Sequence, residues 1–425
     1  MIAWLLISFF VLLFLGVPIA MSLGLSAMGG ILFLGGGSTV TIAQRMFEGM
    51  NSFALLAIPL YTFAGFTMSK GGISKRLMDF CYSIVGHIYG GLAHVNVLSS
   101  MIFAGISGSA VADTAGVSGM FMPEMVRKGY SKNFTVAVTA ISSTIGIIIP
   151  PSIPMVVIAG ICGISTGKLF LGGIIPGILC GLAQMIVSYF MAKKEGVPKE
   201  PGHFTIGPVL HGLWESWPAL LMPIIIVGTI TMGIVSPTEA GVIAVVYGLF
   251  AGGIIYRELK WEDIKFAFAE TVRTSGRIFI VIGAAKLYTV MLTTAGFDKW
   301  VAKTMLGFST NPTVILIVIL LIFFIVTMFM ESIATLTLFM PILYPIALGV
   351  GIDPIVLSVL ITVVIGVGLV TPPVGMCIYV ACDLMDVTVG EVFPTLVPFI
   401  AATFVCIALM VAFPQLILLP TYLMA

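Results

Sequence analysis

Long apolar runs separated by short polar stretches dominate the chain. Met1–Leu15, Ala219–Val235 and Val314–Phe329 contain no charged residue. Runs of this kind suit the interior of a bilayer, where a helix of about 20 apolar residues spans the hydrocarbon core. The pattern predicts an all-α polytopic membrane protein. No basic segment precedes Met1–Leu15 and no small-residue cleavage site follows it, so we expect a retained membrane helix rather than a signal peptide.

The order of short motifs repeats at a nearly constant offset. Gly16-Val17-Pro18 and Val235-Ser236-Pro237, 219 residues apart, each precede an apolar run. Asp113 and Pro123 recur 218 residues later as Glu331 and Pro341, whereas Gly129, Pro150-Pro151 and Pro176 recur 222 residues later as Gly351, Pro372-Pro373 and Pro398. We infer a duplication with a first repeat over 1–192, a cytoplasmic linker over 193–216 and a second repeat over 217–425.

Each repeat contains a segment with a polar break between two apolar arms. In 92–126 the break is Ser107-Gly108-Ser109, and each arm of about 15 residues is about 22 Å long as a helix. This is too short to cross about 30 Å of hydrocarbon, so we expect a re-entrant hairpin. The corresponding hairpin is expected over 312–348, where Val314–Met330 alone could nearly span and the repeat decides the assignment.

A helix broken by two prolines follows each hairpin. We expect these broken helices over 132–163 and 355–382, interrupted at Pro150-Pro151 and Pro372-Pro373. The other expected helices are Ile2–Leu15, Pro18–Leu34, Phe53–Met68 and Leu169–Met191 in the first repeat, and 219–235, 237–256, 277–294 and 392–419 in the second.

The orientation follows from the number of crossings and from the basic residues. Five crossings per repeat, an odd number, require the two repeats to be inverted, as in many secondary transporters. With the N-terminus outside, fourteen Lys and Arg fall in cytoplasmic loops and four outside, with Lys286 inside a helix. This distribution follows the positive-inside rule and predicts that both termini are periplasmic and the linker is cytoplasmic.

The four breaks inside the membrane are the candidate sites of chemistry. Unpaired backbone groups cost several kcal/mol each in hydrocarbon, so such breaks persist where they line a wet cavity or are buried in protein. Freed carbonyls and hydroxyls are hard oxygen ligands for an alkali cation, and half-helix N-termini suit a carboxylate. We expect two sodium sites, formed by Ser107, Ser109, Asp113, Gly146 and Pro150, and by Glu331, Thr335, Gly368 and Thr371. The expected substrate-binding residues are Ser107, Ser109, Ser152, Ser332 and Pro373.

Structural roles remain open for several of these residues. Ser107-Gly108-Ser109 is also compatible with a close helix contact, and each double proline with a simple kink. Asp113 could cap the second hairpin arm instead of binding an ion. For Glu239 we favour structure, because Ser236–Glu239 reads as a capping box with Pro at the first helical position. Lys286 is expected to reach toward the interface rather than to bind an anion.

Composition limits the remaining function classes. The chain is 59% hydrophobic and 9% charged with a mean hydropathy of +1.18, which excludes a soluble domain. A net charge of +1 without a basic tail gives no reason to expect nucleic acid. Six scattered cysteines and four histidines show no metal-ligand spacing, and no nucleophile–base pair is evident. We therefore expect no transition metal, no organic cofactor and no enzymatic activity.

Five motifs carry a resemblance to a known family. They are SGSAVADTAG (107–116), GIIIPPSIP (146–154), GKLFLGGIIPG (167–177), SPTEAG (236–241) and GLVTPPVG (368–375). In this order they resemble the large membrane subunit of tripartite ATP-independent periplasmic (TRAP) transporters over essentially the whole chain. The resemblance implies an elevator-type inverted-repeat transporter in the bacterial inner membrane, driven by a sodium gradient. It also implies a small four-helix membrane subunit, expected here as a separate chain, and a periplasmic binding protein that delivers an organic anion.

The substrate is less well defined. Members of this family carry sugar acids such as sialic acid, C4-dicarboxylates and other organic acids. Ala-Asp-Thr-Ala at 112–115 is more similar to the sugar-acid branch. Two alternatives keep the same apolar architecture: a stand-alone sodium–dicarboxylate symporter, which needs no partner proteins, and an ion channel, which carries current without saturable uptake.

Overall fold

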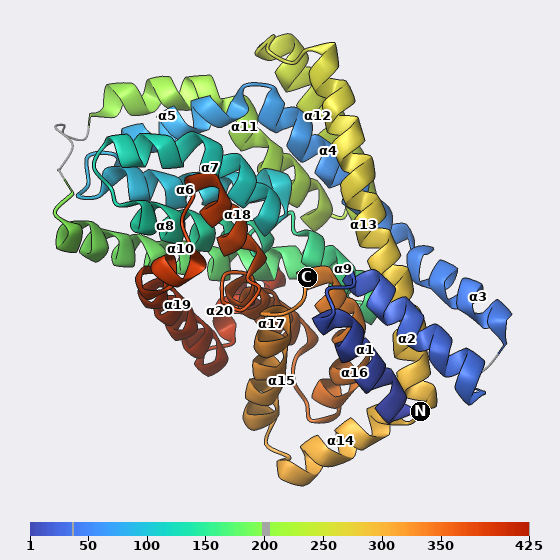
Figure 1. Cartoon of the computed structure of the whole chain (residues 1–425). Coiled ribbons are helices and arrows are strands. Elements are labelled where there is room, and N and C mark those ends of the chain that lie inside the picture. Colours follow the sequence, from blue (N-terminus) through green and yellow to red (C-terminus); the bar gives the residue numbers. More distant parts are fainter. Residues whose placement is uncertain (36–37, 198–204, 425) are drawn as a thin grey trace.

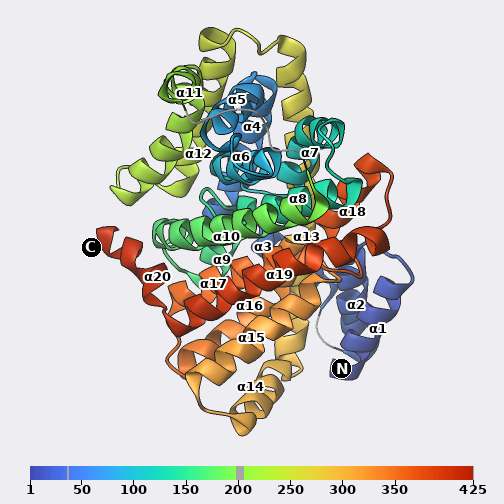
Figure 2. The ribbon, with the colours of Figure 1, turned by 90° about the vertical axis from the view of Figure 1, so that its left-hand side faces the viewer.

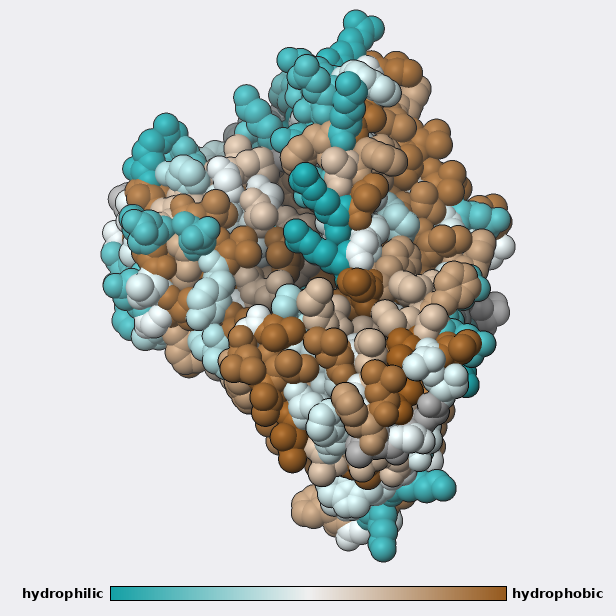
Figure 3. Space-filling model, turned by 45° about the vertical axis from the view of Figure 1, so that its right-hand side comes forward, coloured by the Kyte–Doolittle hydropathy of each residue, from teal (hydrophilic) through white to brown (hydrophobic). Residues whose placement is uncertain are grey.

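The computed structural model describes residues 1–35, 38–197 and 205–424, and these residues form helices and no strand. Seven of the described helices are long and apolar enough to cross a membrane. They are Phe53–Lys70, Thr166–Glu195, Ile206–Thr231, Pro237–Ile255, Trp261–Thr294, Ser332–Gly349 and Val389–Ala412. Apolar side chains cover much of the face shown in Figure 3, and hydrophilic ones gather at its upper end, along its left edge and in a group at its centre, with a few at its lower end. The expected all-α polytopic membrane fold is confirmed.

The first group of helices, here called the scaffold, comes from the start of each half. Its first part consists of α1 (Ile2–Phe14), α2 (Ile19–Leu34), α3 (Thr39–Met50), η1 (Phe53–Leu56), α4 (Ala57–Lys70) and α5 (Ile73–Val85). Its second part consists of α11 (Ile206–Thr231), α12 (Pro237–Phe250), the π-helical turn η3 (Ala251–Ile255), α13 (Trp261–Thr294) and α14 (Phe297–Phe308). The two parts interlock, because α13 packs along α2, α3 and α4, α12 on α4, and α11 on α5 (Figure 1).

The second group, here called the core unit, contains the hairpins and broken helices. From the first half it takes α6 (Gly91–Ser107), α7 (Ala110–Arg127), α8 (Lys132–Ser143), η2 (Thr144–Ile147), α9 (Ile153–Cys162) and α10 (Thr166–Glu195). From the second half it takes α15 (Pro312–Thr327), α16 (Ser332–Gly349), α17 (Pro354–Gly368), α18 (Met376–Met385) and α19 (Val389–Ala412), followed by α20 (Gln415–Leu418) and η4 (Leu419–Met424). The last long helices of the two halves, α10 and α19, lie side by side (Figure 2).

The two helical hairpins and two broken helices expected from the sequence are confirmed. The helices α6 and α7 join at 108–109, and α15 and α16 join through 328–331. The first hairpin has arms of 17 and 18 residues, each about 26 Å long. The broken helices are interrupted over 148–152 and 369–375, and each interruption contains a cis Pro–Pro peptide. The repeat boundaries and the inverted orientation stay predictions.

Some helices are longer than the apolar runs that predicted them. The linker expected over 193–216 is largely helical, because α10 extends to Glu195 and α11 begins at Ile206; its residues 198–204 lie outside the described part of the chain. The helix expected over 277–294 begins at Trp261, and α3 was not expected at all. These additional segments carry charged residues, and an apolar-run criterion misses amphipathic helices that pack on other helices.

The capping box expected at Ser236 is confirmed. The Ser236 hydroxyl accepts a hydrogen bond from the Glu239 N–H at 3.3 Å, and the Glu239 carboxylate accepts one from the Ser236 N–H at 2.6 Å. Both bonds satisfy N–H groups at the start of α12, as a capping box does. The role of Glu239 is therefore structural.

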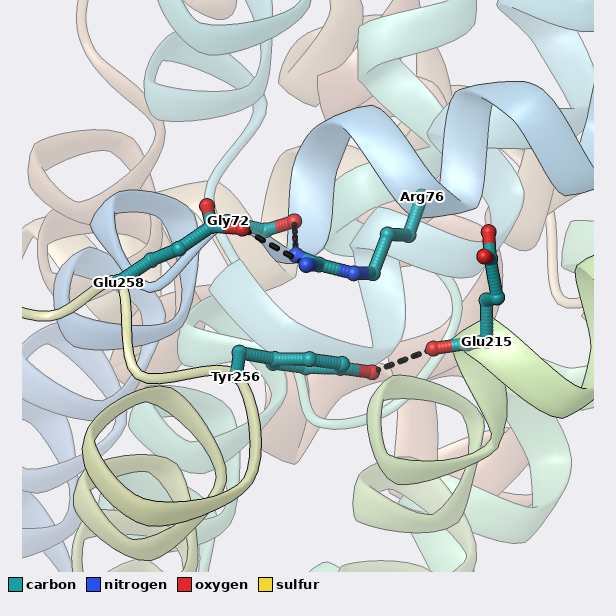
Figure 4. A network of polar contacts seen from close by, with 5 residues as sticks. All are labelled: Gly72, Arg76, Glu215, Tyr256 and Glu258. Carbon is teal, nitrogen blue, oxygen red and sulfur yellow. Dashed lines mark hydrogen bonds and ion pairs between the residues drawn. The ribbon is translucent and has the colours of Figure 1, made fainter.

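A polar network at one end of the scaffold ties its two parts together (Figure 4). Arg76 of α5 forms an ion pair with Glu258 at 2.7 Å and donates to the Gly72 carbonyl at 2.8 Å. Its guanidinium lies 4.2 Å from the centre of the Tyr256 ring, and the Tyr256 hydroxyl donates to the Glu215 carbonyl of α11 at 2.9 Å. The network therefore joins α5 both to α11 and to the segment that leads into α13.

A buried polar cluster holds the first hairpin against the first broken helix. Asn96 of α6 donates to the Thr139 hydroxyl of α8 at 2.7 Å and accepts from the Ser142 hydroxyl at 3.0 Å. Ser100 donates to the Ser142 hydroxyl, also at 3.0 Å. All four residues are fully buried. Because such groups are costly to leave unpaired, this cluster couples α6 and α8 more firmly than apolar packing alone.

Two glycines mark close approaches between helices. A Cβ placed on Gly160 of α9 lies 3.7 Å from the Cβ of Ala54 in η1, so these residues define a scaffold–core pair. A Cβ placed on Gly24 of α2 lies 4.0 Å from the Cβ of Ala284 in α13, and these residues define a scaffold pair. Both distances fall within the range of about 3.5–4.5 Å that a disulfide requires between Cβ atoms.

Candidate functional site

A cavity of about 750 Å³ lies where the two hairpin tips meet the scaffold. Volumes of about 300–1,000 Å³ are typical of small-molecule sites. The wall contains the tip residues Ser107–Asp113 and Glu331–Ala334, the flanks of the helix breaks at Ile147, Ile153, Pro154, Leu369 and Met376, and side chains of α4 and α13. Elements from both halves of the chain therefore build one site.

The first hairpin tip is held against the first helix break by backbone contacts. The Gly108 carbonyl accepts a hydrogen bond from the Ile153 N–H at 3.2 Å. Gly108 has φ of +64°, and a Cβ there would lie 2.6 Å from the Pro151 carbonyl oxygen, so only glycine fits. Ser109 caps α7 by accepting from the Ala112 N–H at 3.5 Å. The N-terminus of α7, with its partial positive charge, lines the cavity.

Only one of the two carboxylate oxygens of Asp113 accepts a hydrogen bond from the described residues. One carboxylate oxygen, Oδ1, accepts a hydrogen bond from the Ser107 hydroxyl. The other, Oδ2, is buried and has no hydrogen-bond partner among the described residues. It faces Gly146, where an added Cβ would lie 2.0 Å from this oxygen. A buried carboxylate oxygen is costly without a partner, so this arrangement suits a bound cation. The helix cap is Ser109, which leaves Asp113 available.

The second hairpin tip uses its carboxylate differently. Glu331 caps α16, because its Oε2 accepts from the Ile333 N–H at 2.9 Å and from the Ala334 N–H at 3.4 Å. Its Oε1 accepts from the Ser332 hydroxyl at 2.7 Å, and the Thr335 hydroxyl donates to the Glu331 carbonyl at 3.0 Å. The side chains of this tip thus satisfy one another within the hairpin.

The second break meets its own hairpin much as the first break does. The Met328 carbonyl accepts from the Val374 N–H at 3.0 Å, the counterpart of the bond between Gly108 and Ile153. A Cβ on Gly368 would lie 2.7 Å from the Thr327 Cβ. The Thr371 hydroxyl donates to the Val367 carbonyl one turn earlier, at 2.7 Å.

Five of the residues expected at the sites line the cavity, namely Ser107, Ser109, Asp113, Glu331 and Ser332. The structure brings Gly146 against Asp113, whereas Pro150 is buried in the first break and is not part of the cavity wall. Thr335, Gly368 and Thr371 are buried around the second tip and its break, and they do not line the cavity either.

Two residues expected to bind substrate lie elsewhere. Ser152 is fully buried, where it donates to the Ile147 carbonyl at 2.5 Å and caps α9 by accepting from the Met155 N–H. Pro373 is exposed and borders a separate shallow hollow of about 350 Å³, together with Tyr379. The side chains of Ser152 and Pro373 are therefore not part of the central cavity.

The scaffold wall of the cavity was not expected from the sequence. One face of α13 contributes Phe266, Glu270, Thr274, Arg277, Ile278 and Val281, and the end of α4 contributes Phe66, Ser69 and Lys70. The α13 residues recur every three or four positions, which is the spacing of one helix face. This spacing is the sequence signal that could have predicted the scaffold wall. In the sequence analysis, Lys70 and Arg277 serve only as cytoplasmic basic residues that indicate the membrane orientation.

With the geometry established, similarity to known proteins identifies the family. Residues 6–416 match the family described as "Tripartite ATP-independent periplasmic transporter, DctM component". This chain belongs to that family. The resemblance seen in the five motifs is confirmed. TRAP large permeases are inner-membrane transport proteins rather than enzymes, so the expected location in the bacterial inner membrane is also confirmed.

Relatives in the TRAP family are named for different substrates. The sialic acid TRAP large permease SiaM of Vibrio cholerae is 35% identical over 96% of this chain and 95% of its own length. The C4-dicarboxylate TRAP large permease DctM of Pseudomonas aeruginosa is 36% identical over 95% of this chain and 94% of its own length. The isethionate TRAP permease DctMQ of Oleidesulfovibrio alaskensis is 37% identical over 92% of this chain, which spans 62% of that relative.

A solved structure shares the fold of this TRAP permease. The crystal structure of the YdaH transporter of Alcanivorax borkumensis covers 89% of this chain and 88% of its own, with a TM-score of 0.59 and 12% sequence identity. At this identity the likeness concerns the fold alone.

Proposed function

We propose that this TRAP permease carries an organic anion into the cell together with sodium ions. The observation that carries the proposal is the junction of hairpin tip and helix break around Asp113. There a buried carboxylate oxygen without a hydrogen-bond partner among the described residues faces Gly146 beside the break, and the Ser107 hydroxyl bonds to the other oxygen of the same carboxylate. Oxygen ligands of this kind suit a hard monovalent cation.

The cavity supports an organic anion as the second cargo. Its volume suits a molecule the size of a small organic acid. The serine hydroxyls and the N-terminus of α7 at the first tip offer hydrogen-bond donors and partial positive charge to a carboxylate. The relatives are named for sialic acid, C4-dicarboxylates and isethionate, which are all organic anions. The sugar-acid preference of the 112–115 motif remains a narrower proposal.

Two sodium sites are proposed, and the first is the better supported. Ser107, Asp113 and the break beside Gly146 leave an acceptor open for a cation. In the second site, Glu331 already accepts three hydrogen bonds from its own hairpin. A cation there would share a carboxylate that also serves as a helix cap.

The transport cycle is proposed to be an elevator motion of the core unit against the scaffold. Each tip is hydrogen-bonded to the break of its own half, so the hairpins and broken helices can move as one body. The scaffold is proposed to hold a small membrane subunit, and a periplasmic binding protein is proposed to deliver the anion, since the family is tripartite.

Uptake measured in proteoliposomes tests the coupling. The chain is reconstituted with its small subunit and binding protein, and uptake of labelled N-acetylneuraminate, succinate and isethionate is followed with an inward sodium gradient or with choline in its place. We expect uptake of one of the three that saturates with sodium. Equal uptake in choline contradicts sodium coupling. Uptake without the binding protein favours the stand-alone symporter, and current without saturable uptake favours a channel.

A further inference from the structure

Two basic side chains line the cavity, and both belong to the scaffold. Lys70 lies at the end of α4, and Arg277 lies on the cavity face of α13. The acidic residues at the hairpin tips, Asp113 and Glu331, belong to the core unit. The cavity therefore carries carboxyl groups at the two tips, whereas the scaffold wall that faces them carries the two basic residues and Glu270.

The two basic residues stand at different depths. The Lys70 ammonium lies 4.7 Å from the centre of the Phe266 ring, which places it level with the first cavity-lining residue of α13. Arg277 follows Phe266 by eleven positions on the same helix, which corresponds to about 16 Å along its axis. The two basic residues are therefore attached at different positions along the cavity wall, with Lys70 level with Phe266 and Arg277 further along α13.

Arg277 is available to a ligand. It makes no hydrogen bond or ion pair with any residue in the described part of the chain, and it is exposed. The acidic residue nearest to it on this face, Glu270, is already paired with Arg273 at 2.5 Å. An unpaired guanidinium in a cavity wall is well suited to bind a carboxylate or sulfonate through two parallel N–H donors.

We propose that Arg277 and Lys70 form a cationic exit path for the organic anion, from the hairpin tips to the cytoplasmic mouth of the cavity. The proposal rests on the anion transport proposed above and adds the scaffold residues that receive the cargo. Arg277 attracts the carboxylate or sulfonate of an anion released at the tips.

Charge-selective thiol labelling tests the path without any knowledge of the natural substrate. Thr274→Cys places a thiol one helical turn from Arg277, and Ser69→Cys places one beside Lys70. Each variant, in lipid nanodiscs, is reacted with anionic 2-sulfonatoethyl methanethiosulfonate and with cationic 2-(trimethylammonium)ethyl methanethiosulfonate. The readout is the ratio of the anionic to the cationic rate. The unsubstituted chain measures the background from Cys162, a partly exposed native cysteine.

The expected change follows from Coulomb's law. A unit charge about 7 Å away in water changes the local concentration of a singly charged reagent about threefold, with opposite sign for the two reagents. Arg277→Gln should therefore lower the ratio at Thr274→Cys by about sevenfold, whereas Arg277→Lys should preserve most of it. Lys70→Gln should have its larger effect at Ser69→Cys.

Lys265→Gln is the matched control, because it removes a positive charge from α13 at a position that does not line the cavity. It should leave both ratios within about twofold of the parent. An unchanged ratio in both Arg277→Gln and Lys70→Gln would overturn the exit path. Labelling needs neither sodium nor cargo, so that result is distinguishable from a failure of sodium-coupled uptake.

Discussion

Replacing Gly146 by alanine tests the proposed first sodium site, where Gly146 faces the Asp113 carboxylate. The added Cβ would lie 2.0 Å from Asp113 Oδ2 and 3.0 Å from its Cγ, distances at which one of the groups must move. Gly146 does not have a positive φ, so alanine is otherwise compatible with its backbone. The substitution therefore acts mainly by displacing the carboxylate from the break.

The magnitude follows from the cost of overpacking. Inserting a methyl group into a packed site typically costs about 1–3 kcal/mol. If the bound state needs the carboxylate in its present place, the same energy weakens sodium binding by about 5- to 150-fold, since about 1.4 kcal/mol corresponds to a factor of ten. Sodium binding is measured as the sodium concentration that gives half of the maximal thermal stabilisation of the purified chain, which requires no substrate.

Gly119→Ala is the matched control, since it adds the same methyl group on α7 where no atom of the described residues, apart from the neighbouring backbone of the same helix, lies within 4 Å of the new Cβ. It should leave sodium binding unchanged. The double variant Gly146→Ala/Asp113→Ala separates the two effects, because a clash that acts through the carboxylate disappears when the carboxylate is absent. The reasoning is refuted if Gly146→Ala binds sodium as tightly as the parent chain.

Two further substitutions probe the packing and the motion. Asn96→Ala removes one hydrogen bond from each of the buried Thr139 and Ser142 hydroxyls, so the free energy of unfolding should fall by about 1–2 kcal/mol. Ser118→Ala removes a buried hydroxyl that has no hydrogen-bond partner among the described residues, and it should leave the thermal midpoint nearly unchanged. A disulfide across the scaffold–core pair, formed in Ala54→Cys/Gly160→Cys, should stop uptake and preserve sodium binding, and reductant should restore uptake. A disulfide across the scaffold pair, formed in Gly24→Cys/Ala284→Cys, should leave uptake intact. Full uptake with a quantitatively formed scaffold–core disulfide would exclude an elevator motion at that interface.

The hairpins and breaks could be predicted because their signals are local. Ser107-Gly108-Ser109 interrupts an apolar run, and two prolines in succession remove backbone donors wherever they occur. The position of Asp113 beside Gly146 was also within reach, since the repeat paired each tip with the break of its own half. The sequence could not predict that Asp113 Oδ2 has no hydrogen-bond partner among the described residues, because this depends on Ser109, rather than Asp113, capping α7.

Other parts of the site could not be predicted from apolar runs. Ser152 and Pro373 lie in motifs at the breaks, yet one side chain turns to cap its own helix and the other faces a separate hollow. Which way such a side chain points depends on tertiary packing. The cavity face of α13 begins in its charged, amphipathic first half, which reads as a loop when only apolar runs are counted.

The bonds between tips and breaks have a consequence for how the chain is made. The Gly108 carbonyl pairs with the N–H of Ile153, 45 positions later, and the Met328 carbonyl pairs with that of Val374, 46 positions later. At a synthesis rate of about 5–20 residues per second, each hairpin emerges from the ribosome about 2–9 s before its partner. During that interval its tip lacks the group that satisfies it, so it must stay in contact with water or with the insertion machinery. Membrane integration of each half is therefore complete only after its broken helix has been translated, and a chain arrested between hairpin and break should remain sensitive to membrane quality-control proteases.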